Sequence, residues 1–348
     1  MTAIVNYGDI SPAVAAYSVV RMLERGMPYL CFEKFGQTYP LPTNSTTTAK
    51  FRRYYLSGAT GAAGNSTGAF YIPIATTPLV EGVTPTGSTL SNQDYTVTLA
   101  QYGDFITITD VVTDTHTDNV LNSATEILGE QAAVTVETLR FNVLKAGTNV
   151  FYGNAVAGRA NVITAISRAD QRKVTTALNR QNAKKITSIV ASTADYNTKS
   201  IEAAYVAVIH PDLESDVRNM TGFVPTSDYG PHTTPWENEI GAVEQVRYIS
   251  STVAAPFVDT GGTAVTNSLR FTTANTACDI YPVLYFARDA FGIVPLKGKS
   301  SMTPMVVNPK PAPGDPLAQR GTVGWKLWTA TVILQELYMG RLEVGATA

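Results

Sequence analysis

The feature that most constrains the fold of this chain is the long segment from Leu41 to Thr98. Within it, the stretch from Ser57 to Gly68 (SGATGAAGNSTG) contains no large apolar side chain. Such a stretch cannot bury enough apolar surface to offset the entropy lost on ordering, so we predict a mobile tip there. Strand-like runs lie on either side of the tip, at Lys50–Tyr55 and Tyr95–Leu99. Because connections longer than about 15 residues are uncommon inside compact domains, we predict a long hairpin that reaches outward.

The charge content limits the classes of partner. Charged residues make up 16% of the 348 residues, against about 25% in an average soluble domain. We therefore expect large surfaces to be covered by Thr, Ser, Asn, Gly or partner chains. The formal net charge of −2 argues against a dedicated nucleic-acid binder, which carries a strong basic patch. It is compatible with a protein that encloses nucleic acid.

The two cysteines, Cys31 and Cys278, are far apart, and neither lies in a C-x-x-C pair or beside a histidine. We therefore expect neither a disulfide framework nor a zinc site. The first residues lack a basic region followed by an apolar run, and no stretch approaches 18 uninterrupted apolar residues. We expect a soluble protein with no signal peptide and no membrane span.

Two amphipathic helices flank the long hairpin. The first begins at Ser11-Pro12 and ends before Pro28, with Ser as N-cap and Pro at the first helical position. The second begins at Asp118, runs to about Lys145 and would span about 40 Å. Its apolar stripe consists of Leu121, Ala124, Leu128, Ala132, Leu139 and Val143. The alternation in Gln101–Val112 predicts a strand before this helix.

The rest of the chain has a mixed α and β pattern without an internal repeat, so we predict an α+β fold. Ser167 begins a further helix that runs to about Asn182, and Pro211 opens a short helix through Arg218. Predicted strands are Ile186–Ala191, Ala203–Ile209, Val243–Ile249, Tyr281–Ala287 and a long closing strand Val323–Leu334. Gly222–Pro235 is predicted to be a loop, and Pro304–Pro316, which holds five prolines, to have little regular structure.

Motifs for catalysis or cofactor binding are weak. Gly298-Lys299-Ser300 resembles the end of a phosphate-binding loop, but the nearest preceding glycine, Gly292, is one residue too far away. The acidic group Asp110, Asp114, His116 and Asp118 lacks the glycine and the terminal glutamate of a calcium loop. The three histidines are dispersed, and a G-x-S-x-G motif is absent. We predict no catalytic residue, no metal and no cofactor.

Cations and aromatic residues alternate near the base of the hairpin, at Lys50, Arg52, Arg53 and Tyr54. This pattern resembles a nucleic-acid surface, but the rest of the chain supplies no basic groove. We favour ion pairs with acidic residues elsewhere, in the same chain or in a neighbouring subunit. Glu126, Glu130 and Glu137 on the long helix are the predicted partners.

Many short runs, spread over nearly the whole chain, are similar to the major capsid proteins of coliphage N-four and its relatives. They include Tyr7–Pro12, Lys50–Tyr54, Pro78–Pro85, Gln101–Asp104, Thr109–Val112, Leu128–Ala133, Leu144–Val150, Gly222–Pro225, Val294–Lys299 and Asp315–Gly321. The resemblance implies the tailed-phage major capsid fold, of the Hong Kong ninety-seven type. Ser57–Gly68 and Asp259–Asn275 match least.

The resemblance also implies a layout and a function. Residues 1–40 would be an N-terminal arm, 41–102 an E-loop hairpin, 103–185 a P domain with a spine helix at 118–145, 186–296 an A domain, and 297–348 a return to the P domain with the closing strand. The protein would self-assemble into pentamers and hexamers that form an icosahedral head shell around double-stranded DNA, without sequence-specific binding. Its place would be the virion, after assembly in the cytoplasm of a bacterial host.

Further partners that the resemblance implies are scaffold, portal and decoration proteins; no membrane is involved. Two alternatives stay open at this point: another structural virion protein, such as a decoration or tail component, and an enzyme whose site is unrecognised. Decoration proteins are usually shorter and tail fibres commonly show repeats, and this chain has neither property. We therefore predict a structural protein rather than an enzyme.

Overall fold

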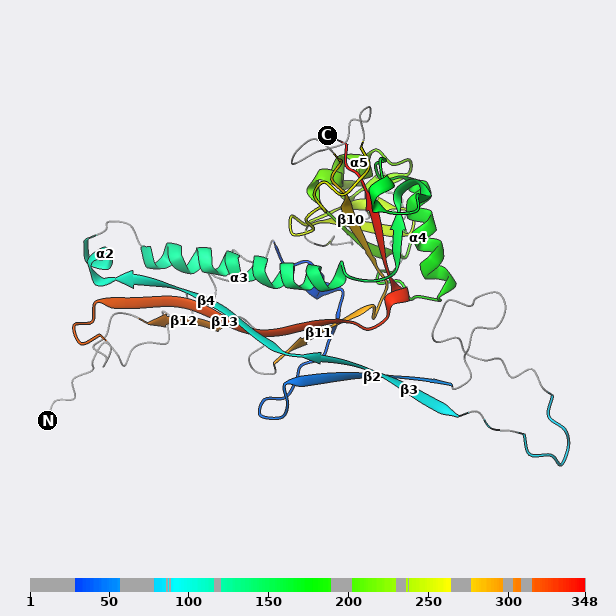
Figure 1. Ribbon diagram of the computed structural model, residues 1–348, viewed down its shortest axis with the longest axis horizontal. Coiled ribbons are helices and arrows are strands. Elements are labelled where there is room, and N and C mark those ends of the chain that lie inside the picture. Colours follow the sequence, from blue (N-terminus) through cyan, green and yellow to red (C-terminus); the bar gives the residue numbers. More distant parts are fainter. Residues whose placement is uncertain are drawn as a thin grey trace.

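A computed structural model of the chain describes residues 29–56, 78–85, 87, 89–115, 120–188, 202–229, 236, 238–263, 277–296, 303–307 and 315–347. The predicted helix after Ser11, the tip from Ser57 to Gly68 and the Gly298-Lys299-Ser300 motif lie outside these residues. The described parts form an elongated lower layer, from which a compact upper lobe rises near one end (Figure 1).

The lower layer is a five-stranded sheet built around one long strand, β13 (Arg320–Ile333). Along one edge β13 pairs antiparallel with β4 (Ala100–Thr109), and along the other with β12 (Thr303–Val307) and β11 (Phe291–Pro295). The short β1 (Gln37–Thr38) adds to β11 in parallel. The predicted strands at 101–112 and 323–334 are confirmed, although β4 ends at Thr109, where α2 (Asp110–Thr115) begins. β12 overlaps the proline-rich stretch Pro304–Pro316, which was predicted to have little regular structure, so that prediction was wrong in part.

The long helix α3 (Val120–Leu144) lies along one face of this sheet (Figure 1). Apolar side chains that alternate along the strands, among them Ile108, Val323 and Trp325, pack against Ala124 and Leu128 of the helix. Period-two alternation in the strands and a helical stripe therefore meet in one core. The predicted helix is confirmed, while the Asp118 cap lies outside the described residues.

The predicted stripe of α3 is correct only in its first half. Leu139 and Val143 are partly exposed, and the buried positions continue through Val136, Phe141 and Leu144. Leu121 has no described side chain. Glu137 and Arg140 are also buried, where Arg140 Nη1 donates a 2.8 Å hydrogen bond to Glu137 Oε1. Two charged residues occupy the buried face of the second half of the helix. For this reason the apolar pattern alone assigns the wrong helix face to the core after Thr135.

The upper lobe contains a seven-stranded sheet with helices on one face. Its strand order is β5 (Val150–Tyr152), β14 (Met339–Val344), β10 (Tyr281–Phe286), β6 (Tyr205–Ile209), β9 (Val246–Ser250), β8 (Glu239–Val243) and β7 (Phe223–Pro225). The central strands are buried along their whole length, as expected for a sheet covered on both faces. The core on the helix side joins Val174 and Leu178 of α4 (Arg168–Arg180) to Tyr205, Tyr248 and Tyr285.

Several local predictions for this lobe are confirmed. Ser167 caps α4, because its hydroxyl accepts a 3.2 Å hydrogen bond from the Asp170 N–H. Pro211 opens a short helical segment made of a 3-10 turn (Pro211–Leu213) and α5 (Glu214–Arg218). The Nδ1 atom of His210 accepts from the Asp212 N–H at 3.2 Å, so this histidine is a capping residue.

Three local predictions were wrong. The single strand predicted over Val243–Ile249 is broken by a hairpin turn between β8 and β9, where Glu244 has a φ of 50°. Of the strand predicted at 186–191, the described residues 186–188 are not in a strand. The predicted loop after Gly222 contains β7. The polar turn residues Glu244 and Gln245 lie between apolar residues of both strands, and this alternation is compatible with a single strand, which explains the first error.

The segment that begins at Tyr29 ties the two layers together. Phe32 is fully buried between Phe141 of α3 and Phe286 of β10, with ring centroids 6.3 Å and 6.0 Å away. Its N–H donates to Glu137 Oε2 at 3.1 Å. Arg140 also reaches Glu33 at 3.3 Å. The segment at Tyr29–Phe35 therefore packs between the long helix and the upper lobe.

The two layers are also joined where α3 and β13 run into the lobe. β5, which follows α3, pairs in parallel with β14, which follows β13. The Thr148 N–H donates to Glu336 Oε2 at 2.9 Å, and the Asn149 side chain donates to the Met339 carbonyl at 2.8 Å. Arg341 donates to the Lys145 carbonyl near the end of α3. These contacts join the lower layer to the upper lobe, and we call the region that contains them the neck.

Candidate assembly surfaces

The predicted outward hairpin is confirmed as two antiparallel strands, β2 (Thr48–Leu56) and β3 (Leu90–Thr98), which project at one end of the lower layer (Figure 1). At its base, Ala49 and Leu99 are buried against Val294 of β11. The Phe51 ring sits over Gly292, where a Cβ atom would come within 2.9 Å of the ring. The base is therefore packed on the body of the subunit.

The cations of the hairpin pair inside the subunit. Arg52, which lies opposite Asp94 in the strand register, donates two hydrogen bonds of 2.7 and 2.9 Å to its carboxylate. These bonds hold the pKa of Asp94 below its usual range. Lys50 lies 3.7 Å from the same carboxylate. Arg53 donates to the Gln335 side chain.

Within the described residues, Lys50 and Arg52 pair with Asp94 and not with the predicted glutamates of the long helix, and Arg53 contacts Gln335. Sequence reasoning missed Asp94 and Gln335, because the pairings depend on strand register and on how the hairpin rests on the body. Of the predicted partners, Glu130 accepts a 2.6 Å hydrogen bond from the Tyr29 hydroxyl, and Glu126 is partly exposed. Glu137 is fully buried, which raises its pKa. A buried carboxylate paired to Arg140 cannot meet a neighbouring subunit, so its selection as an interface residue was wrong.

Large apolar side chains remain exposed at both ends of the lower layer. On the hairpin these are Tyr54, Leu90 and the turn residues Leu79, Val80 and Val83. On the sheet they are Phe105, Met305 and Val307. Monomeric soluble proteins rarely leave contiguous apolar surface uncovered, and such patches mark contacts with other chains.

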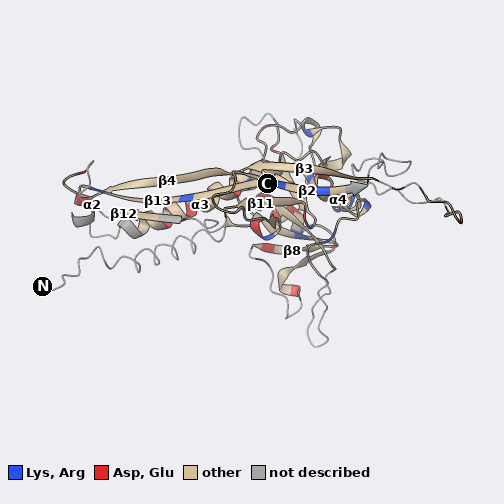
Figure 2. Ribbon diagram, turned by 90° about the horizontal axis from the view of Figure 1, so that it is seen from below, with Lys and Arg blue, Asp and Glu red and all other residues tan. Residues whose placement is uncertain are grey.

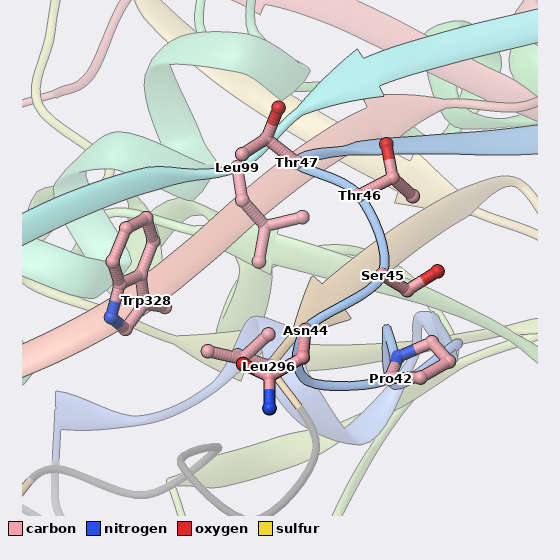
Figure 3. Close-up of a pocket in the computed structure, with 8 residues that line it drawn as sticks. All are labelled: Pro42, Asn44, Ser45, Thr46, Thr47, Leu99, Leu296 and Trp328. Carbon is pink, nitrogen blue, oxygen red and sulfur yellow. The ribbon is translucent and has the colours of Figure 1, made fainter.

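A hollow of about 300 Å³ lies under the base of the hairpin (Figure 3). Its lining consists of Pro42, Asn44, Ser45, Thr46, Thr47, Leu99, Leu296 and Trp328. None of these side chains titrates, so the hollow has no acid, base or charged ligand of its own for catalysis. Its apolar wall suits contact with another chain better than chemistry.

Across the described residues, His, Cys, Asp and Glu side chains do not gather in groups of three that could hold a metal ion. In the predicted acidic group, the Asp110 carboxylate accepts from the Val111 N–H at 2.8 Å, while His116 and Asp118 lie outside the described residues. No helix within the described part is both long and apolar enough to cross a bilayer. Cys31 and Cys278 are both buried free thiols.

Charged residues occur singly or in small groups along the described part of the ribbon (Figure 2). In the upper lobe, Arg168 and Arg172 bind Glu244 at the turn between β8 and β9 and lower the pKa of its carboxyl to about 2. Arg159 and Arg341 bind the fully buried Glu343, at 2.7 and 2.9 Å. These pairs fix the turn and the β14 strand.

The comparisons with known proteins agree with this geometry. The family described as phage capsid protein matches residues 93–340, more than half of the chain. The capsid of Ralstonia phage GP4 has a TM-score of 0.64 at 13% identity and covers 100% of this chain and 99% of its own. The capsid of cyanophage P-SCSP1u has a TM-score of 0.57 at 14% identity, with 90% and 88% covered. The cyanophage Pam1 capsid has a TM-score of 0.55 at 16% identity, with 100% and 95% covered.

No curated protein matches the chain by sequence. The likeness to solved structures at these identities concerns the fold, and it confirms the predicted α+β capsid fold. The family match covers both the sheet with its long helix and most of the upper lobe. The chain therefore belongs to the phage capsid protein family.

Proposed function

We propose that this chain is the major capsid protein of a tailed bacteriophage, related to that of coliphage N-four and with the Hong Kong ninety-seven type of fold. It forms pentamers and hexamers that close into the icosahedral head shell around double-stranded DNA. The observation that carries this proposal is the family match, together with a likeness to the Ralstonia phage GP4 capsid over the whole chain. Uncovered apolar surface at both ends of one subunit supports repeated association.

The described elements support the proposed layout. The arm is residues 1–40, the β2–β3 hairpin is the E-loop of residues 41–102, and α3 is the spine helix of a P domain that starts at 103. We place the start of the A domain at Val150 rather than at 186, because β5 and α4 pack in the upper lobe. Residues 297–348 return to the P domain through β13 and end in the lobe as β14.

The hairpin is the element that reaches a neighbouring subunit. Tyr54 is 61% exposed, and Lys50 and Arg52 keep 57% and 46% of their side-chain surface open. An exposed ion pair such as the one with Asp94 contributes little to stability, because solvent screens it. The cations can therefore also meet carboxylates of another copy, for which Glu126 and Glu130 stay candidates.

A container for DNA does not need a strongly basic wall. Each cationic contact with phosphate adds to the affinity, so a basic lining would hinder packing and release of DNA. The net charge of −2 supports this role. In the proposal the protein has no catalytic activity, meets scaffold, portal and decoration proteins, and is assembled in the bacterial cytoplasm before it resides in the virion.

Electron microscopy of the purified protein at rising concentration tests the proposed function. Closed shells or rings of five and six subunits are expected. A chain that stays monomeric under all assembly conditions would contradict the proposal.

A charge exchange tests the role of Arg52. Replacement of Arg52 by Asp should reduce shell formation and leave a folded monomer. In the control, Arg52→Asp combined with Asp94→Arg restores the pair inside the hairpin without restoring a contact to a neighbour. If that double variant assembles like the wild type, Arg52 acts only within its own subunit.

A further inference from the structure

This inference rests on the proposed function and concerns a local excess of positive charge on the upper lobe. The segment 168–185, which comprises α4 and the turn after it, contains a single carboxylate, Asp170. Its six cations are Arg168, Arg172, Lys173, Arg180, Lys184 and Lys185. The whole chain has more acidic than basic residues, so this excess is local. Lysine and arginine gathered along one helix are the electrostatic footprint of a nucleic-acid contact.

Helical spacing places the protruding cations on one face of α4. The opposite face, with Val174 and Leu178, is buried in the core of the upper lobe. Between positions 172 and 180 the exposed residues are Arg172, Lys173, Thr176, Asn179 and Arg180. None of these is acidic or apolar. α4 lies at the margin of the upper lobe, on the side away from the long helix (Figure 1), so this basic face is presented outward.

The carboxylates next to the basic face are recessed and already bound. Asp170 keeps 3% of its side-chain surface open, against 45% for its partner Lys173. Glu244 is shared by Arg168 and Arg172, and it is 29% exposed, against 55% for Arg172. The Arg172 guanidinium uses Nε and Nη2 for this carboxylate, which leaves the donors of Nη1 for an outside ligand. A ligand that approaches from solvent therefore meets the cations first.

The positive charge continues past the end of the helix. The Lys184 carbonyl accepts a 2.9 Å hydrogen bond from the Arg288 N–H, and both residues are exposed. Asp289 is exposed beside Arg288. Glu336, in a short turn that also packs on α4, accepts from the Thr148 N–H at 2.9 Å. With these residues included, cations still outnumber carboxylates here, by seven to four.

The dimensions of this face fit a DNA backbone. Arg172 and Arg180 lie about 12 Å apart along the helix axis, and duplex DNA carries one negative charge per about 1.7 Å of its axis. The face can therefore meet about four phosphates at once. Phosphates repeat in every register, so cations without a special pattern bind them and read no sequence. The helix dipole favours cations only in the last turn, and Arg172 and Lys173 lie in the first half of α4.

We propose that the exposed face of α4, together with Lys184, binds the phosphate backbone of the enclosed double-stranded DNA. This side of the upper lobe then faces the interior of the shell. About four contacts per subunit bind DNA weakly at physiological salt, so the DNA can still be packed and released. The basic face holds the outermost turns of DNA at one place on each subunit, while the rest of the wall stays near neutral.

Salt-dependent DNA binding by the soluble subunit tests this face. The probe is a fluorescent duplex of about 20 base pairs, and the readout is its anisotropy at rising salt. The test variant combines Lys173→Gln, Arg180→Gln and Lys184→Gln. Glutamine at 173 keeps a donor for Asp170, and Arg172 is retained because it fixes the turn at Glu244. The matched control removes the same charge from exposed positions elsewhere, with Arg218→Gln, Arg320→Gln and Lys326→Gln.

The wild-type affinity should fall roughly 150-fold between about 50 and 200 mM salt, as expected for about four phosphate contacts, and that of the test variant only about fourfold. At about 50 mM salt the test variant should bind at least about tenfold more weakly than the wild type, and the control variant should bind like the wild type. Equal losses in the two variants, or a wild type without salt-dependent binding, would overturn the proposal. Tighter binding of polyglutamate than of the duplex would also overturn it, because the partner would then be an acidic protein segment.

The orientation of the face is tested in shells. A small amine-reactive reagent should label Lys173 and Lys184 more slowly in DNA-filled shells than in empty shells. Equal labelling would contradict an interior position for α4 and leave the proposed function standing. If the wild-type chain forms no shells, the proposed function fails, whereas the anisotropy measurement on the soluble subunit still reports on this face alone.

Discussion

Replacement of Phe32 by alanine tests whether the segment at Tyr29–Phe35 holds the long helix and the upper lobe together. The Phe32 ring is fully buried between Phe141 and Phe286. Truncation of a buried phenylalanine costs about 3–5 kcal/mol, which includes the cavity that remains. Because both neighbouring rings lose an aromatic contact, we expect a loss in the upper part of this range.

The measurement is urea unfolding of the unassembled subunit, followed by tryptophan fluorescence. The matched control is Phe105→Ala, the same chemical change at a site that is 65% exposed, where a change within about 0.5 kcal/mol is expected. Hydrogen exchange should also increase at the end of α3 and in β10. If Phe32→Ala lowers the free energy of unfolding by less than about 1 kcal/mol, or if the two variants lose the same amount, Phe32 does not hold the helix and the lobe together.

Two further outcomes follow from the contacts described above. Hydrogen bonds and ion pairs with Arg172 and Arg168 lower the pKa of Glu244 to about 2 from 4.5, so its contribution to stability is present above pH 4.5 and is lost as the pH falls toward 2. Glu244→Gln should therefore cost about 1 kcal/mol at neutral pH and flatten the acid limb of a melting-temperature profile; an unchanged acid limb would speak against this pair. Gly292→Ala should place a methyl group against the Phe51 ring and raise hydrogen exchange in β2 without unfolding the subunit. Unchanged exchange in β2 would mean that the hairpin base adapts.

Sequence reasoning succeeds where the determining signal is local. The alternation of the hairpin strands, the serine cap of α4 and the length of α3 are all encoded within a few residues of each other. These elements agree with the structure within a few residues at each end.

The predictions failed where distant segments decide the outcome. The partner of Arg52 is 42 positions away and is selected by strand register. In the sequence Glu137 looks like a surface charge. In the structure Phe32 covers it and Arg140 pairs with it. Phe32 itself has no sequence signal that would distinguish it from any other aromatic residue in an arm.

The neck between the lower layer and the upper lobe has a mechanical consequence. The long helix α3 is followed by β5 and the long strand β13 by β14, and these two strands pair in the upper lobe. β14 also forms a six-residue antiparallel ladder with β10. A pull on β14 along its own axis therefore loads this ladder in shear, so its hydrogen bonds resist together and do not open one at a time. The fully buried Glu343, held by two arginines in the middle of β14, anchors the same strand against sliding. A subunit built in this way resists separation of the upper lobe from the lower layer.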